Sequence, residues 1–240
     1  MIIIPDVHGR DFWKGPVYES LGKEHIVFLG DYIDPYDDER IPPDDAFSGF
    51  QEIVSIKRNH PEAVTLLLGN HDLHYLSDEI RGSRYDFPNA VRNSRFISEN
   101  ATIFEIAHIS VDNERKILFT HAGLQRGWVE KYDNILGGTE VMKIVETLNQ
   151  LWLDSSFRPV LFSMLADIPF SRLGLSPYGS PIWNDVDDMS DASDGFPGWY
   201  QIFGHSQQES EPVITDHYAC LDCRSAFRLE ANQDAIITAV

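Results

Sequence analysis

The chain has 240 residues, 42% of them hydrophobic and 24% charged, which is the composition of an ordinary folded protein and excludes general disorder. Its length favours one domain that covers residues 1–240. A formal net charge of −19 repels nucleic acid and anionic membranes, so we expect neither as a partner, although bound cations would still allow a small phosphorylated substrate.

The amino-terminal sequence carries no recognisable targeting signal, because its apolar run is short and has no basic region before it. No apolar run approaches the roughly 18 residues of a membrane span. We therefore expect a cytoplasmic protein. Its two cysteines, Cys220 and Cys223, lack the second pair of a zinc site, and we interpret them as packed thiols.

Strands and helices alternate at the start of the chain. Apolar runs predict buried strands at 2–4, 26–29 and 64–68, and amphipathic stretches predict helices at 11–21 and 46–59. A β-α-β-α-β order predicts a parallel sheet, and the ligand site of such a sheet lies at the carboxyl ends of its strands.

Helices and short strands alternate in the rest of the chain. We predict helical structure over 73–100, with a break at 82–88, and over most of 127–167. A hairpin is predicted from 103–111 and 116–119, with residues 112–115 as its turn. Further short strands are predicted at 200–203, 213–215, 218–221 and 235–240. The acidic run at 185–194 is interpreted as a solvated loop or, alternatively, as a lid beside the site.

Polar residues of metal-binding type follow five of the predicted strands. Asp6 and His8 are alternate residues, so an extended backbone points them the same way. Carboxylate, imidazole and amide groups together suit Mn, Fe or Zn better than Ca. Any one of these residues alone would be an ordinary loop residue, but the set predicts a metal site. The strand exits carry Asp6, His8, Asp31, Asp34, Asn70, His71, His121 and His205.

Five short motifs at these exits resemble those of a known family. In chain order they are Asp-x-His-Gly, Gly-Asp-x-x-Asp, Gly-Asn-His-Asp, His-Ala-Gly and Gly-His, and they run from residue 6 to residue 205. This pattern is similar to the calcineurin-like metallophosphoesterases. The branch it most resembles is the PPP type, which includes bacterial protein Ser/Thr phosphatases and symmetrical diadenosine tetraphosphatases. The resemblance implies an α/β fold in which two mixed β-sheets form a sandwich flanked by helices.

The resemblance also implies a role for each exit residue. Two divalent metal ions (Mn, Fe or Zn) are expected as cofactors, bridged by Asp31 because a carboxylate has two oxygens to share. A hydroxide between the metals would attack the phosphate in line. His71 would protonate the leaving oxygen, and Asp34 would orient and charge His71. The remaining implied ligands are Asp6 and His8 for the first metal, and Asn70, His121 and His205 for the second.

The chain departs from the PPP pattern where a phosphate-binding arginine is usual. Pro35 and Tyr36 follow Asp34, so that arginine is absent. Arg10 and Arg172 are taken as candidate substrate-binding residues, and Arg84, Arg92 and Arg95 are further alternatives.

The expected function is hydrolysis of phosphate monoesters, with a phosphoprotein as the substrate class. The alternative is a dinucleoside polyphosphate hydrolase, because Asp72-Leu73-His74 and His121-Ala122-Gly123 resemble the diadenosine tetraphosphatases, although Asp34 is retained as in the protein phosphatases. His74 itself is expected to be a helix residue without a catalytic role or, alternatively, a residue that supports the catalytic groups from behind. A non-catalytic metal-binding scaffold is the third possibility, and it would need neither Asp34 nor His71.

Overall fold

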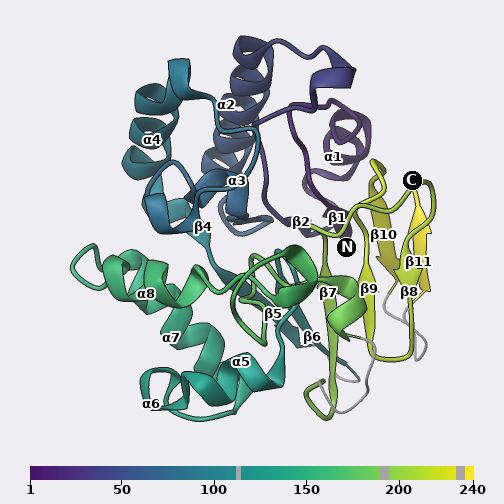
Figure 1. Ribbon diagram of the computed structural model, residues 1–240. Helices are drawn as coiled ribbons and strands as arrows, with labels where there is room; N and C mark the ends of the chain where they lie inside the picture. Colours follow the sequence, from purple (N-terminus) through teal and green to yellow (C-terminus); the bar gives the residue numbers. More distant parts are fainter. Residues whose placement is uncertain (112–114, 190–194, 231–235) are drawn as a thin grey trace. The chain divides into compact units, whose positions relative to one another are not determined.

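The computed structural model describes residues 1–111, 115–189, 195–230 and 236–240. Two compact units make up the chain, and Figure 1 labels their helices and strands. The first unit combines residues 1–104 with the returning segment 224–240, and the second consists of residues 105–223. Each unit is built around one β-sheet.

Three parallel strands form the centre of the first sheet, as predicted. They are β1 (Ile2–Ile4), β2 (Ile26–Phe28) and β3 (Val64–Leu67), and they are hydrogen-bonded side by side in this order. All of their residues are buried, which explains why each reads as an uninterrupted apolar run. Parallel pairing brings the three polar strand exits to the same edge of the sheet.

Two antiparallel strands from the returning segment extend this sheet beyond β1. β10 (Phe227–Glu230) pairs with β1, and β11 (Ile236–Ala239) pairs with β10. β10 was not predicted, although buried Phe227 and Leu229 alternate with more exposed neighbours in the period of a strand. The short β4 (Phe104–Glu105) follows β3 at the other end of the sheet order, which is β11-β10-β1-β2-β3-β4.

Four α-helices belong to the described part of the first unit: α1 (Lys14–Ser20), α2 (Pro43–Asn59), α3 (Asn70–Leu73) and α4 (Ala90–Glu99). α2 begins before the predicted residue 46, because Pro43 occupies its first turn, where the missing N–H is tolerated. The continuous helix predicted before 82 was wrong. Between α3 and α4 the chain has only two 3-10 turns, at Asp78–Ile80 and Phe87–Asn89.

The second sheet has the order β5-β6-β7-β9-β8. β5 (Ala107–Val111) and β6 (Lys116–Thr120) are antiparallel, which confirms the predicted pairing, while 112–114 of its turn lie outside the described residues. β7 (Trp199–Phe203) is parallel to both β6 and β9 (Tyr218–Cys220). The edge strand β8 (Val213–Ile214) is antiparallel to β9.

The helices of the second unit follow β6 in the chain. They are α5 (Arg126–Lys131), α6 (Asp133–Leu136), α7 (Val141–Leu153) and α8 (Arg158–Leu165). α7 packs on β5, and Asn149 on this helix accepts a hydrogen bond from the backbone N–H of Ile106 at 2.8 Å. Of the predicted acidic loop, Val186–Met189 form a 3-10 turn and 190–194 lie outside the described residues.

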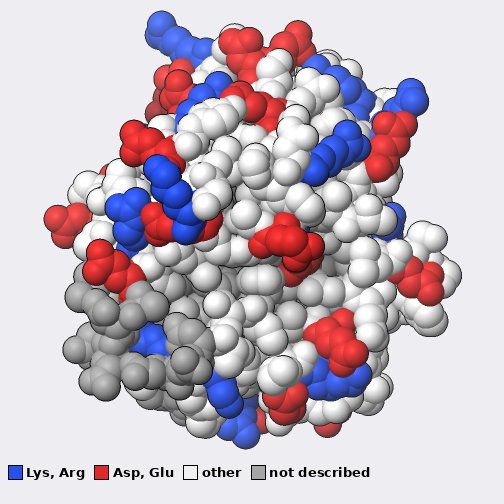
Figure 2. All heavy atoms as spheres, turned by 180° about the vertical axis from the view of Figure 1, so that it is seen from behind, with Lys and Arg blue, Asp and Glu red and all other residues white. Residues whose placement is uncertain are grey.

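Both sheets contain parallel and antiparallel pairs and carry helices, so the predicted α/β class with two mixed sheets is confirmed. None of the described helices is both long and apolar enough to cross a membrane. Cys220 and Cys223 are buried and form no disulfide. Figure 2 shows acidic side chains scattered among lysines and arginines on one face, so the negative charge seen there forms no single patch.

Candidate metal centre

The loops that leave β1 and β2 are joined by backbone hydrogen bonds. The N–H of His8 donates to the carbonyl of Asp31 at 2.7 Å, and the N–H of Gly9 donates to that of Tyr32 at 3.0 Å. His8, Asp31 and Asp34 all have left-handed backbones, with φ of 45°, 53° and 61°. Non-glycine residues seldom adopt this conformation, and those that do often lie at functional sites, which agrees with the predicted ligand roles.

Asp6, His8 and Asp31 form a buried cluster in the first unit. One ligand atom from each lies within 4.8 Å of the others, and each residue is at most 2% exposed. The His8 ring is fixed by a hydrogen bond between Nδ1 and the carbonyl of Ile33 at 3.0 Å, which turns Nε2 toward the cluster, 3.5 Å from Oδ2 of Asp31. Burial lowers the pKa of His8 to about 3, although nearby Asp31 opposes the shift. A neutral imidazole between two carboxylates is a donor set that fits a divalent cation.

Asp72 connects the loops that follow β2 and β3. Its buried carboxylate accepts backbone hydrogen bonds from Asp31 at 2.8 Å, Tyr32 at 3.1 Å and Gly69 at 2.9 Å. Burial and the neighbouring Asp31 raise the pKa of Asp72. Close approach of the loops also requires Gly30, because a Cβ there would lie 2.5 Å from the backbone nitrogen of Gly69.

The Asp34 carboxylate is surrounded by three side chains from α3 and the residues just after it. Oδ2 lies 3.0 Å from Nδ1 of His71 and 2.7 Å from Nε2 of His74, and Oδ1 accepts a hydrogen bond from the Tyr75 hydroxyl. Burial acts to raise the pKa of Asp34, but the two imidazoles outweigh it and hold that pKa below its ordinary value. An ionised Asp34 keeps a proton on Nδ1 of His71. For His74 the contact with Asp34 agrees with the alternative of a supporting residue. Tyr75 was not predicted here, because its contact with Asp34 spans some forty positions of the chain.

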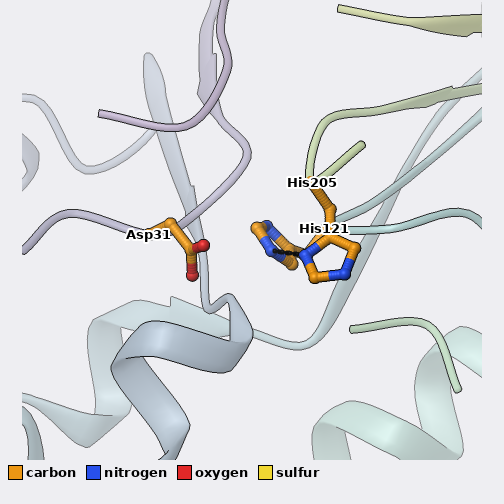
Figure 3. Close-up of side chains that lie close together, drawn as sticks. All are labelled: Asp31, His121 and His205. Carbon is orange, nitrogen blue, oxygen red and sulfur yellow. Dashed lines mark hydrogen bonds between the residues drawn. The ribbon is translucent and has the colours of Figure 1, made fainter. Parts of the chain in front are cut away.

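The second unit brings two of the predicted metal ligands together. His121 follows β6 and His205 follows β7, and these strands are parallel neighbours, so both exits lie at the same edge. Nε2 of His121 lies 3.2 Å from Nδ1 of His205 (Figure 3), and the N–H of Gly204 donates to the carbonyl of His121 at 2.8 Å. Asn70, the remaining predicted ligand, is buried in the first turn of α3 in the first unit.

The two arginines chosen from the sequence are engaged with acidic partners. Nε of Arg10 donates to Glu39 at 2.8 Å, and its Nη1 donates to the carbonyl of Asp6 at 3.2 Å. Arg172, in the second unit, lies 3.0 Å from Oδ2 of Asp185. Arg84, one of the alternatives, instead donates from Nε to the carbonyl of Asp34 at 3.2 Å.

Buried carboxylates and a neutral imidazole at the carboxyl edge of a parallel sheet are the chemistry of a metallophosphoesterase. The chain belongs to the calcineurin-like phosphoesterase family, whose model matches residues 2–208. The resemblance read from the five motifs is therefore confirmed, and the chain is a phosphoric ester hydrolase.

Solved structures of phosphatases share the fold. One is a cold-active protein tyrosine phosphatase, which is 18% identical with a TM-score of 0.60 over 99% of this chain and 77% of that one. Another is a protein serine/threonine phosphatase from Saccharomyces cerevisiae, 13% identical with a TM-score of 0.58 over 99% of this chain and 78% of that one. A comparison with curated proteins finds no match.

Proposed function

We propose that the chain hydrolyses phosphate monoesters with the help of two divalent metal ions. Asp6, His8 and Asp31 would hold the first ion, and their buried cluster supports this assignment. The second ion would take Asn70, His121 and His205, with Asp31 shared between both ions. Residues 1–240 would thus act as one catalytic domain.

Each part of the reaction has a matching group in the chain. When bound, two adjacent divalent cations activate a water and neutralise the phosphate oxygens. His71 would donate a proton from Nε2 to the leaving oxygen, because its Nδ1 is held by Asp34 at 3.0 Å. The ionised Asp34 would stabilise the protonated ring before the transfer. This His71–Asp34 pair, with the His71 ring centroid 5.1 Å from that of His8, is the observation that carries the proposal.

A phosphoprotein is the proposed substrate class, and Mn, Fe or Zn the proposed metals. The two fold relatives named above are both protein phosphatases by description, which supports this choice. A dinucleoside polyphosphate hydrolase remains the second candidate because of the sequence Asp72-Leu73-His74. A metal-binding scaffold is disfavoured, since it would not need the His71–Asp34 pair. We also propose that the protein acts in the cytoplasm.

Product analysis of the Mn-loaded protein tests the proposal. A phosphopeptide and diadenosine tetraphosphate are offered together, with metal-free protein and His71→Asn as controls. Free phosphate from the peptide with the dinucleotide intact is the expected result. Symmetric cleavage of the dinucleotide would favour the second candidate, and no turnover of either would favour the scaffold.

A further inference from the structure

Arg84 contacts the two sides of the segment that follows Asp34, where this chain has Pro35 and Tyr36. Its guanidinium carbon lies 3.7 Å from the ring centroid of Tyr36, which follows Pro35 in the departing sequence. Its Nε donates to the carbonyl of Asp34 at 3.2 Å. Two contacts therefore hold one guanidinium beside the strand exit, although Arg84 comes from a different loop, between the two 3-10 turns.

The outer nitrogen of Arg84 reaches the reactive atoms of the candidate site. Nη2 lies 3.3 Å from Nε2 of His8 and 3.2 Å from Nε2 of His71. These are the ring nitrogens assigned to the metal and to the leaving oxygen. Within the described residues, no carboxylate oxygen lies within 4.0 Å of an Arg84 nitrogen, in contrast to Arg10. A guanidinium beside metal ligands, without a carboxylate partner of its own, is suited to an anion that arrives with the substrate.

The backbone of Arg84 is also unusual. Its φ is 53°, in the left-handed region that non-glycine residues seldom adopt. The surrounding contacts hold this conformation, and strain of this kind often accompanies a ligand-binding position. The left-handed backbone therefore agrees with an Arg84 side chain that binds a ligand rather than one that only packs.

A cavity of about 350 Å³ in the first unit adjoins this group. Asp34, Tyr36 and Arg84 line it together with Tyr85 and Arg92. Because Arg84 also contacts His71, a phosphate bound at the guanidinium could direct its leaving group into this cavity. The lining offers aromatic rings and charges of both signs, which suits a peptide side chain and its flanking backbone.

We propose that Arg84 binds the substrate phosphate and that Tyr36 is the positioning residue that holds its guanidinium by stacking. The assignment deepens the proposed function and rests on it. A planar guanidinium donates two parallel hydrogen bonds to phosphate oxygens, which an ammonium cannot do. Arg10 is less suited, since Nε is occupied by Glu39 and Nη1 by the carbonyl of Asp6.

Binding of inorganic phosphate and of orthovanadate to the metal-loaded protein tests the proposal by calorimetry. We expect Arg84→Ala to weaken both affinities by about 10²-fold, and kcat/KM for p-nitrophenyl phosphate by a similar factor. Arg84→Lys should recover part of the loss. Metal content and melting temperature, measured on each variant, separate an effect on phosphate from an effect on folding. Arg95→Ala, an exposed arginine paired with Glu99 on α4, is the matched control.

Tyr36 variants test the positioning role separately. Tyr36→Phe keeps the ring face that Arg84 covers and should bind phosphate like the wild type, whereas Tyr36→Leu should raise KM more than it lowers kcat. Wild-type phosphate affinity in Arg84→Ala, or no phosphate and vanadate binding by the metal-loaded wild type, would overturn the inference. A wild type that binds phosphate but hydrolyses no ester would overturn the proposed function alone, and the Arg84 affinities would still decide the inference.

Discussion

The carboxylate of Asp72 holds the backbone of Asp31, whose N–H lies 2.8 Å from Oδ2. The last acid of the Gly-Asn-His-Asp motif thus fixes Asp31, the proposed metal ligand of the preceding motif, and the side chain of Asp31 in turn accepts a hydrogen bond from the N–H of His71 at 2.9 Å. The two exit loops are therefore fixed to each other by their own carboxylates before any metal binds.

Replacement of Asp72 should loosen both loops. Asp72→Asn leaves one acceptor oxygen for three buried backbone donors, and we expect a loss of about 3 kcal/mol in the free energy of unfolding. Urea denaturation of the metal-free protein measures it, with Asp38→Asn at an exposed position as the control. An unchanged unfolding midpoint would show that these hydrogen bonds do not stabilise the loops.

Replacement of Gly30 should be far more costly than that of Gly22. Both have left-handed backbones, with φ of 110° and 75°, but only at Gly30 does an added Cβ meet other atoms within 4 Å. Gly22→Ala should therefore cost about 1 kcal/mol, which is the backbone strain alone. Gly30→Ala should cost several times as much, because the Cβ would separate the exit loops of β2 and β3. Equal melting temperatures for the two variants would contradict this explanation.

Replacement of His71 should affect substrates according to their leaving groups. We expect His71→Asn to lower kcat by about 10³-fold for an alkyl phosphate such as phosphoserine, since its leaving oxygen needs a proton. The loss for p-nitrophenyl phosphate should be much smaller, because p-nitrophenolate leaves without one. Steady-state kinetics on both substrates, with metal content measured in parallel, checks this. The same loss on both would remove His71 from the role of general acid.

Replacement of one proposed metal ligand at a time should change the number of metal ions bound per chain, by an amount that depends on the ligand. Asp31→Asn should reduce the binding of both ions, because this carboxylate is assigned to both, whereas His121→Ala should remove one ion and spare the other. Metal analysis by mass spectrometry after dialysis gives the number of ions per chain. Two ions retained by Asp31→Asn would rule out the shared position.

Acid should destabilise the first unit partly through Asp34. The folded pKa of this residue lies below its ordinary value of 3.8, so as the pH falls the unfolded chain takes up the proton first. Its contribution to stability is therefore complete above about pH 5 and is lost as the pH falls through the folded pKa. Asp34→Asn should flatten the decline of the unfolding free energy between pH 5 and pH 3. An equally steep decline in the metal-free variant would assign acid sensitivity to other groups.

The sequence predicted the parts of the site that depend on local pattern. Apolar runs marked β1 to β3, and parallel pairing then placed Asp6, His8 and Asp31 at one edge. The prediction missed β10 because its alternating pattern covers only four residues, and its pairing with β1 joins segments that are far apart in the sequence. The chain was expected to be helical from 73 to the break at 82. Instead, His74 and Tyr75 contact the carboxylate of Asp34, and Arg84 further along contacts its carbonyl.

The role of Arg84 could not be read from the sequence for a related reason. Five arginines were possible, and nothing in their local sequence distinguishes them. The choice depends on which side chain lies over Tyr36 and which is paired with a carboxylate, and both depend on contacts between residues far apart in the chain. The short motifs contain the proposed reacting groups, whereas the residue proposed to bind the substrate phosphate lies in a loop outside these motifs.

The pairing of β1 with β10 has a consequence for synthesis on the ribosome. β1 and the proposed ligands Asp6 and His8 are synthesised well before β10, the strand that pairs with the outer edge of β1. Until then an apolar strand has an open edge, which is a site for pairing with other chains. A chain that stalls before β10 would therefore carry the proposed ligands Asp6 and His8 on a sheet with an aggregation-prone edge.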